Sequence, residues 1–248
     1  MLFGCLQKKG VAMQQSAYYC LIASLFLVGC GTSKKENPDP LEPMNRTIYK
    51  ANKVLDRALI KPVSQGYSQL PAGAQSGVDN FFNNINEIPN TFNNVVQCKW
   101  NQAAKSSSRF LVNTTFGGFG FLDVASHMGL QYEKEDFGQT LATWGYAQSS
   151  YLVLPLFGPS TMRDTMGMTV DSGIGIWPHL DSEYRYGLRA VYGISTRAKL
   201  LSQEKAISAA AIDEYSMVRD AYLQRRNFVI SDGVLPTDDY PEDDYWAE

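Results

Sequence analysis

The sequence predicts a single, mostly α-helical domain with few or no strands. Apolar residues recur at spacings of three and four along several segments, which is typical of amphipathic helices. Alternation with a period of two, which would indicate strands, is rare. No long internal repeat or second domain is evident, and 248 residues are enough for one sizeable core.

The first 30 residues have the pattern of an export signal. Lys8 and Lys9 precede a short apolar run from Ala17 to Val28. The run ends in a stretch that resembles the lipobox of bacterial lipoproteins, Leu27-Val28-Gly29-Cys30-Gly31. A transmembrane anchor is the alternative, but a span needs roughly 20 apolar residues and this run is shorter. We therefore predict that residues 1–29 are a signal peptide.

That resemblance implies a diacylglyceryl group on the Cys30 thiol and an acyl chain on its new amine. Several acyl chains on one residue hold a protein firmly in a membrane, whereas one chain holds it only marginally. Residue 31 is glycine and not the aspartate that tends to retain lipoproteins at the inner membrane, so we expect the periplasmic leaflet of the outer membrane. Residues 30–38 read as a lipidated polar tether. Apart from the acyl chains we expect no cofactor.

The helical domain is predicted to extend over residues 39–231. Its first helix has Asp39 as a candidate N-cap and is expected to end at Lys61-Pro62. A second helical stripe from Val78 is expected to close at Pro89, and another begins near Trp100. Two more helices, around residues 184–201 and 215–223, finish the domain, the last with Asp213 as a possible cap.

Asparagines are concentrated in the middle of this region. Asparagine is a mediocre helix former that prefers caps and turns. We expect these residues to cap short helices, and the alternative is that they line a polar cavity. They are Asn80, Asn83, Asn84, Asn86, Asn90, Asn93 and Asn94.

Charge is distributed unevenly along the chain. Residues 232–248 hold seven acidic side chains and no basic one, so we predict an acidic disordered tail there. The body carries no clustered basic run of the kind that a nucleic-acid partner requires. We therefore expect a membrane-anchored protein with no nucleic-acid partner.

Several ordered motifs resemble the VacJ/MlaA family of lipoproteins, from about Asp39 to Phe228. They are Asp39-Pro40-Leu41-Glu42-Pro43-Met44-Asn45-Arg46, Asn113-Thr114-Thr115-Phe116-Gly117 with Asp123-Val124-Ala125, Asp136-Phe137-Gly138-Gln139-Thr140-Leu141 with Trp144-Gly145, Leu154-Pro155-Leu156-Phe157-Gly158-Pro159-Ser160-Thr161-Met162-Arg163-Asp164, Thr196-Arg197-Ala198, and Val218-Arg219-Asp220-Ala221-Tyr222.

The resemblance implies a ring-like helical domain, with irregular Gly/Pro segments, around an amphipathic channel. It implies an outer-membrane lipoprotein that removes mislocalised phospholipids from the outer leaflet. The lipids would pass to a soluble periplasmic lipid-carrier protein, so that lipid asymmetry is maintained. The implied protein partner in the membrane is a trimeric porin. No bond is made or broken, so the implied protein is not an enzyme.

One departure from the family pattern lies just before the Leu-Val-Leu-Pro segment. The family usually has Gly-x-Gly-Pro-Tyr there, whereas this chain has Ala147, Gln148, Ser149, Ser150 and Tyr151. Losing two glycines and a proline changes the conformations available to this loop. Its conformation is therefore left open.

The segment from Tyr151 to Gly158 is the predicted lipid path. Irregular backbone at membrane depth is tolerated where it lines a cavity or is buried in protein. We predict that this segment lines or gates the path, and a buried core loop is the equal alternative. Its residues are Tyr151, Leu152, Val153, Leu154, Pro155, Leu156, Phe157 and Gly158.

Sites for chemistry are poorly represented. His127 and His179 have no metal-ligand spacing around them, and no Gly-x-Ser-x-Gly elbow is present. Cys98 is expected to be a small core residue, as are Trp100, Trp144 and Trp177, although tryptophans also settle at membrane interfaces. We expect the Arg163 and Asp164 side chains to form a local ion pair or cap. A non-transporting adaptor that binds porins and a lipid hydrolase are the alternative functions.

Overall fold

The computed structural model describes residues 37–234, except for the side chains of residues 205–210. The predicted signal peptide (1–29), the predicted lipidation site Cys30 and all but the last two residues of the predicted tether (30–38) lie outside the described residues. Residues 235–248 of the predicted acidic tail also lie outside them. The compact unit that these residues form begins at Asp39.

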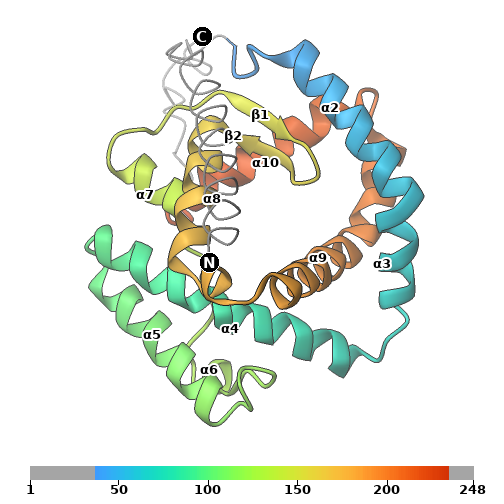
Figure 1. The fold of residues 1–248 in the computed structure, drawn as a ribbon. Helices are drawn as coiled ribbons and strands as arrows, with labels where there is room; N and C mark the ends of the chain where they lie inside the picture. Colours follow the sequence, from blue (N-terminus) through green and yellow to red (C-terminus); the bar gives the residue numbers. More distant parts are fainter. Residues whose placement is uncertain (1–36, 235–248) are drawn as a thin grey trace, which may run out of the picture. The chain divides into compact units, whose positions relative to one another are not determined.

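Helices make up most of this unit, and the mostly α-helical fold class is confirmed (Figure 1). None of the described helices is long and apolar enough to span a membrane. The elements, in chain order, are α2 (Glu42–Leu55), the π-helix η1 (Asp56–Ile60), α3 (Lys61–Tyr67), α4 (Ala72–Val96), α5 (Trp100–Thr115), α6 (Val124–His127), α7 (Phe137–Thr143), β1 (Tyr151–Leu154), β2 (Gly158–Thr161), α8 (Met162–Ile174), the 3₁₀-helix η2 (Trp177–His179), α9 (Ser182–Ala210) and α10 (Glu214–Ile230).

Contacts between these elements close a circuit. Along it, α2 continues through η1 into α3, α3 packs on α9, α9 packs on α4, and α4 packs on α8. The circuit returns through the hairpin, because α8 contacts β2, β2 pairs with β1, and β1 contacts α2. In Figure 1, α5 lies outside the circuit against α4, and α6 packs on α5.

The expected stops at Pro62 and Pro89 are wrong. The chain continues past Lys61-Pro62 because the π-helical turn ends there and Pro62 occupies the first turn of α3, where its missing N–H is not needed. Pro89 lies inside α4, a helix of 25 residues. There the packing of α4 on its neighbours outweighs the loss of one backbone hydrogen bond.

The segment around Pro155 forms a hairpin, which corrects the expectation of an irregular stretch. β1 and β2 pair antiparallel, with Tyr151 opposite Thr161 and Leu154 opposite Gly158. Tyr151 and Val153 point into the small core with Tyr215, whereas Leu152 and Leu154, which alternate with them, are only partly buried. Pro155 is tolerated because it lies in the turn and not in a ladder position.

Asparagine side chains of α2 hold the hairpin by its backbone. Asn45 donates to the Tyr151 carbonyl at 3.2 Å and accepts from the Val153 N–H at 2.9 Å. Asn52, two turns later, donates to the Leu154 carbonyl at 2.8 Å and accepts from the Leu156 N–H at 2.9 Å. These four bonds fix β1 against α2.

Asp39 does not cap the first helix, because α2 begins only at Glu42. Its carboxylate is buried and accepts from Asn45 Nδ2 at 2.8 Å and from the Tyr215 hydroxyl. Asp213, by contrast, caps α10 as expected, accepting from the Tyr215 N–H at 3.2 Å.

The expected burial of Cys98 and two of the tryptophans is also wrong. Cys98 is exposed in the turn between α4 and α5, with a φ of 61°. Trp100 and Trp144 are exposed, whereas Trp177 is partly buried against Phe82.

Candidate functional site

The candidate site is a cavity of about 620 Å³ bounded by members of the circuit. Its lining comes from α4, the segment before α7, β2, α8, η2, α9 and α10, so distant parts of the chain meet in one wall. Apolar surface is provided by residues such as Phe82, Met168, Trp177 and Val229. Charged and amide side chains provide the rest, so the cavity is amphipathic.

The asparagines of α4 contribute to this wall and do not cap helices, which corrects the capping expectation. Asn83, Asn86 and Asn90 line the cavity from the interior of α4. Asn90 is buried and accepts from the Glu135 N–H at 3.1 Å while donating to the Glu133 carbonyl at 3.1 Å. The alternative use that the sequence left open, lining a polar cavity, therefore describes these three residues.

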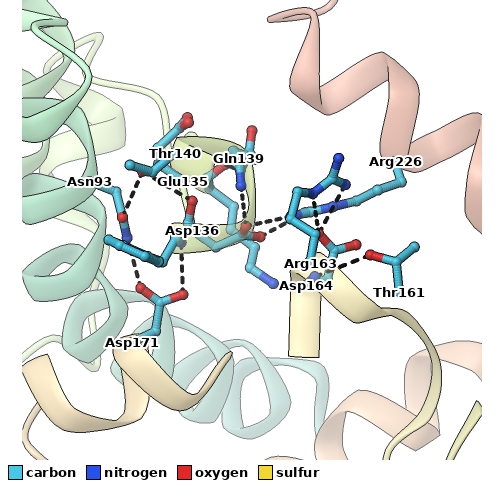
Figure 2. A network of polar contacts seen from close by, with 12 residues as sticks. Asn93, Glu135, Asp136, Gln139, Thr140, Thr161, Arg163, Asp164, Asp171 and Arg226 are labelled. Carbon is cyan, nitrogen blue, oxygen red and sulfur yellow. Dashed lines mark hydrogen bonds and ion pairs between the residues drawn. The ribbon is translucent and has the colours of Figure 1, made fainter. Parts of the chain in front are cut away.

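Asn93 joins three elements at one point. Its Nδ2 donates to the Asp171 carboxylate of α8 at 2.8 Å, and its Oδ1 accepts from the Thr140 hydroxyl of α7 at 2.8 Å (Figure 2). Asp171 also accepts from the Phe137 N–H at 2.9 Å. Burial raises the pKa of Asp171, although these two hydrogen bonds oppose that shift.

Arg226 of α10 connects two further acids of the wall, Asp136 and Asp164. Its guanidinium donates to the Asp136 carboxylate, with one contact at 2.7 Å, and lies 2.9 Å from Asp164 (Figure 2). Burial alone would raise the pKa of Asp136, but the hydrogen bonds and charge of Arg226 outweigh it and hold that pKa below its usual value. Asp136 also caps α7 by accepting from the Gln139 N–H at 3.0 Å.

Arg163 and Asp164 form the local ion pair that the sequence predicts. Arg163 Nε donates to Asp164 Oδ1 at 3.0 Å, and the Asp164 N–H donates to the capping hydroxyl of Thr161 at 3.1 Å. Arg163 is buried, and its Nη1 also donates to the Ala147 carbonyl at 2.7 Å. The loop that departs from the family pattern is thus held by Arg163.

Close backbone packing brings α7 and α8 together beneath this network. A Cβ added to Gly167 would lie 2.4 Å from the Gly138 nitrogen. A Cβ added to Gly138 would lie 2.5 Å from both Asp164 Oδ1 and Arg226 Nη2. Glycine at both positions therefore lets the carboxylates and Arg226 approach one another.

The predicted lipid-path segment is distributed over two environments, and none of its residues lines this cavity. Tyr151 and Val153 are core residues, whereas Leu156 and Phe157 are exposed at the hairpin turn, 66% and 72% respectively. A role in lipid passage stays a prediction for this segment. β2 continues the hairpin into the wall, where Pro159 and Ser160 line the cavity.

Sequence reasoning missed Asn93, Asp171 and Arg226 as members of one network. The high content of asparagine in α4 left a polar cavity open as an alternative to capping. Apolar periodicity, however, could not predict which elements pack against α4. Among the described residues, no group of three or more His, Cys, Asp or Glu side chains could hold a metal ion.

Comparison with known proteins gives a consistent result. A model of the MlaA lipoprotein family matches residues 37–229. The chain is 33% identical over 228 residues to the intermembrane phospholipid transport system lipoprotein MlaA of Escherichia coli (strain K12), covering 89% of this chain and 90% of that protein. The Haemophilus influenzae protein of the same name is 31% identical over 229 residues, covering 87% and 90%.

A solved structure agrees with these relatives. It comes from work on the structural basis for maintenance of bacterial outer membrane lipid asymmetry. It matches with a TM-score of 0.70 at 33% identity and covers 77% of this chain and 98% of that chain. The family expected from the motifs is confirmed, and the chain belongs to the MlaA lipoprotein family.

Proposed function

We propose that this protein is an outer-membrane lipoprotein that removes mislocalised phospholipids from the outer leaflet and thereby maintains lipid asymmetry. The observation that carries the proposal is the match to MlaA lipoproteins of the phospholipid transport system over nearly their whole length. The amphipathic cavity supports it, because a phospholipid needs apolar surface for its chains and polar groups for its headgroup.

The finer parts of the proposal concern location and partners. We propose that acyl chains on Cys30 anchor the protein in the periplasmic leaflet of the outer membrane. Its proposed partners are a trimeric porin beside it and a soluble periplasmic carrier that receives the lipid. The exposed apolar side chains of α5 and of the following turn, such as Leu111, Phe116 and Phe119, suit a position against lipid or protein.

Deletion of the gene in its own host tests the transport function. Phospholipid should become detectable on the cell surface, and the intact gene should reverse the effect. The purified protein should carry intact phospholipid. An adaptor without transport activity would carry none, and a hydrolase would release lyso-lipid and free fatty acid.

The hairpin offers a sharper test of the lipid path. A photo-crosslinking residue at the exposed Leu156 or Phe157 should capture phospholipid in intact cells. The matched control is the same residue at Lys50, which is exposed on α2. A charged substitution of Leu156 should raise the amount of phospholipid on the cell surface. If that amount stayed at the wild-type level in a folded protein, the hairpin turn would not be part of the lipid path.

A further inference from the structure

The carboxylates that line the cavity and the cations that line it differ in how far other residues engage them. Five carboxylates line it, and each already has partners among the described residues. Asp79 pairs with Lys199 at 2.8 Å, and Glu135 pairs with Lys99 at 3.5 Å. Asp136 and Asp164 pair with Arg226, and Asp171 accepts the hydrogen bonds of Asn93 and the Phe137 N–H.

Two cations of the same wall lack an ion pair or hydrogen bond of this kind, although the charge of Lys134 acts to lower the pKa of Asp136 and of Asp171. Lys134 and Arg225 line the cavity, and within residues 37–234 neither forms an ion pair or a side-chain hydrogen bond. Both side chains are exposed, so solvent and a ligand can reach them. Lys134 immediately precedes Glu135, whose N–H donates to Asn90, and Arg225 immediately precedes Arg226 on α10.

A third group in the wall is also unsatisfied. The Nε of Arg226 is buried and has no hydrogen-bond partner, although the two Nη atoms of the same side chain are engaged by Asp136. A buried donor without a partner costs free energy unless a ligand or water completes it. Arg226 lines the cavity together with its neighbour Arg225.

We infer that Lys134 and Arg225 bind the phosphate of a phospholipid headgroup in this cavity and so act as specificity-determining residues. The inference rests on the proposed function. Lysine and arginine are the side chains that bind phosphate best, and arginine can do so with two parallel hydrogen bonds. Apolar lining from Phe82, Met168 and Trp177 accommodates the beginning of the acyl chains.

The test compares two double charge reversals in the full-length, lipidated protein. Lys134→Glu with Arg225→Glu changes the cavity. Lys50→Glu with Arg57→Glu changes a lysine of α2 and an arginine of η1 that are also exposed. Neither has an ion-pair partner among the described residues, and neither lines the cavity. Phospholipid retained per protein after detergent purification is measured by phosphorus assay and mass spectrometry.

The cavity variant should retain at least about tenfold less phospholipid than the wild type, the size expected when charge-assisted hydrogen bonds are replaced by repulsion. The α2–η1 variant should retain the wild-type amount. Should the charge reversal fail to fold, Lys134→Gln with Arg225→Gln should show a smaller loss in the same direction. Wild-type retention in the cavity variants would overturn the inference.

Two further ligands separate a headgroup site from a collapsed cavity and from a site for free phosphate. Diacylglycerol has acyl chains and no phosphate, so the wild type and the cavity variant should bind it equally. A loss of diacylglycerol binding would mean that the cavity had collapsed and would overturn the assignment. Inorganic phosphate that bound the wild type as tightly as phospholipid would also overturn it, in favour of a free-phosphate site. A wild-type protein that carried no phospholipid would instead overturn the proposed function.

Discussion

Arg226 pairs with carboxylates from two other elements of the cavity wall. It is largely buried and faces two carboxylates, Asp136 from the N-terminus of α7 and Asp164 from the first turn of α8. A buried charge is stable only when it is paired and hydrogen-bonded. The three side chains therefore stabilise one another and hold three helix segments together.

The pH dependence of stability should report on this pairing. Arg226 holds the folded-state pKa of Asp136 below its unfolded value, which is about 3.9. The folded state therefore binds fewer protons, so the contribution is present above that unfolded value and is lost as the pH falls through the lower folded pKa. Asp136→Asn should lower the melting temperature at neutral pH and flatten its decline on acidification.

Measurement of melting temperatures from about pH 7 to about pH 3 checks this expectation. Glu133→Gln is the control, because Glu133 is exposed and its side chain bonds to Lys105 at the surface. An acid decline in Asp136→Asn as steep as in the wild type would assign the pH dependence to other groups.

Two glycines of α8 should differ in their effect on stability, because only one of them lies where α8 contacts α7. Gly167→Ala should destabilise the protein by about 1–3 kcal/mol or more, because the added Cβ would meet the Gly138 backbone at 2.4 Å. Gly173→Ala, in the same helix, meets nothing within 4 Å and should stabilise by about 0.5–1 kcal/mol. Urea denaturation of the two variants measures the difference, and equal effects would contradict the close packing of α7 on α8.

Elements differed in how well the sequence predicted them. The helices α5, α8 and α10 begin close to where their apolar periodicity begins, because their faces are set by local spacing. The course of the chain at Pro62 and Pro89 could not be predicted, because a π-helical turn and packing between helices decide it. The hairpin was missed because burial alternates over only four residues in β1 and does not alternate in β2.

The cavity could be predicted only in part for a similar reason. The asparagines of α4 and the pair Arg163–Asp164 were visible in the sequence. Their partners Asp171 and Arg226 lie 78 and 62 residues away, respectively, from Asn93 and Asp164. Only the packing of α4, α7, α8 and α10 brings those groups together.

At the scale of the whole molecule, many large apolar side chains are exposed. Phe116 and Phe119 in the turn after α5 are 77% and 75% exposed, and Trp100 at the start of α5 is 63% exposed. Soluble monomers rarely leave extended apolar patches uncovered. We therefore expect this region to contact the bilayer in addition to the proposed acyl anchor.

Residues 31–248, which lack the cysteine proposed to be lipidated, should bind vesicles of phosphatidylethanolamine and phosphatidylglycerol. Phe116→Asp with Phe119→Asp should weaken that binding at least about tenfold, because each buried ring contributes roughly 1.5–3 kcal/mol. Asn101→Asp with Gln102→Asp adds the same charge to exposed polar positions of α5 and is the control. Vesicle sedimentation measures binding, and equal binding of both variants would place the bilayer contact elsewhere.

The hydrogen bonds from Asn45 and Asn52 to the backbone of β1 have a consequence for association between molecules. An unpaired strand edge is a template on which another chain can add a strand and begin to aggregate. Here amide side chains of α2 already occupy the Tyr151 and Leu154 carbonyls and the Val153 and Leu156 N–H groups. A third strand has no free partners on that side, so this edge of β1 is protected from edge-to-edge polymerisation.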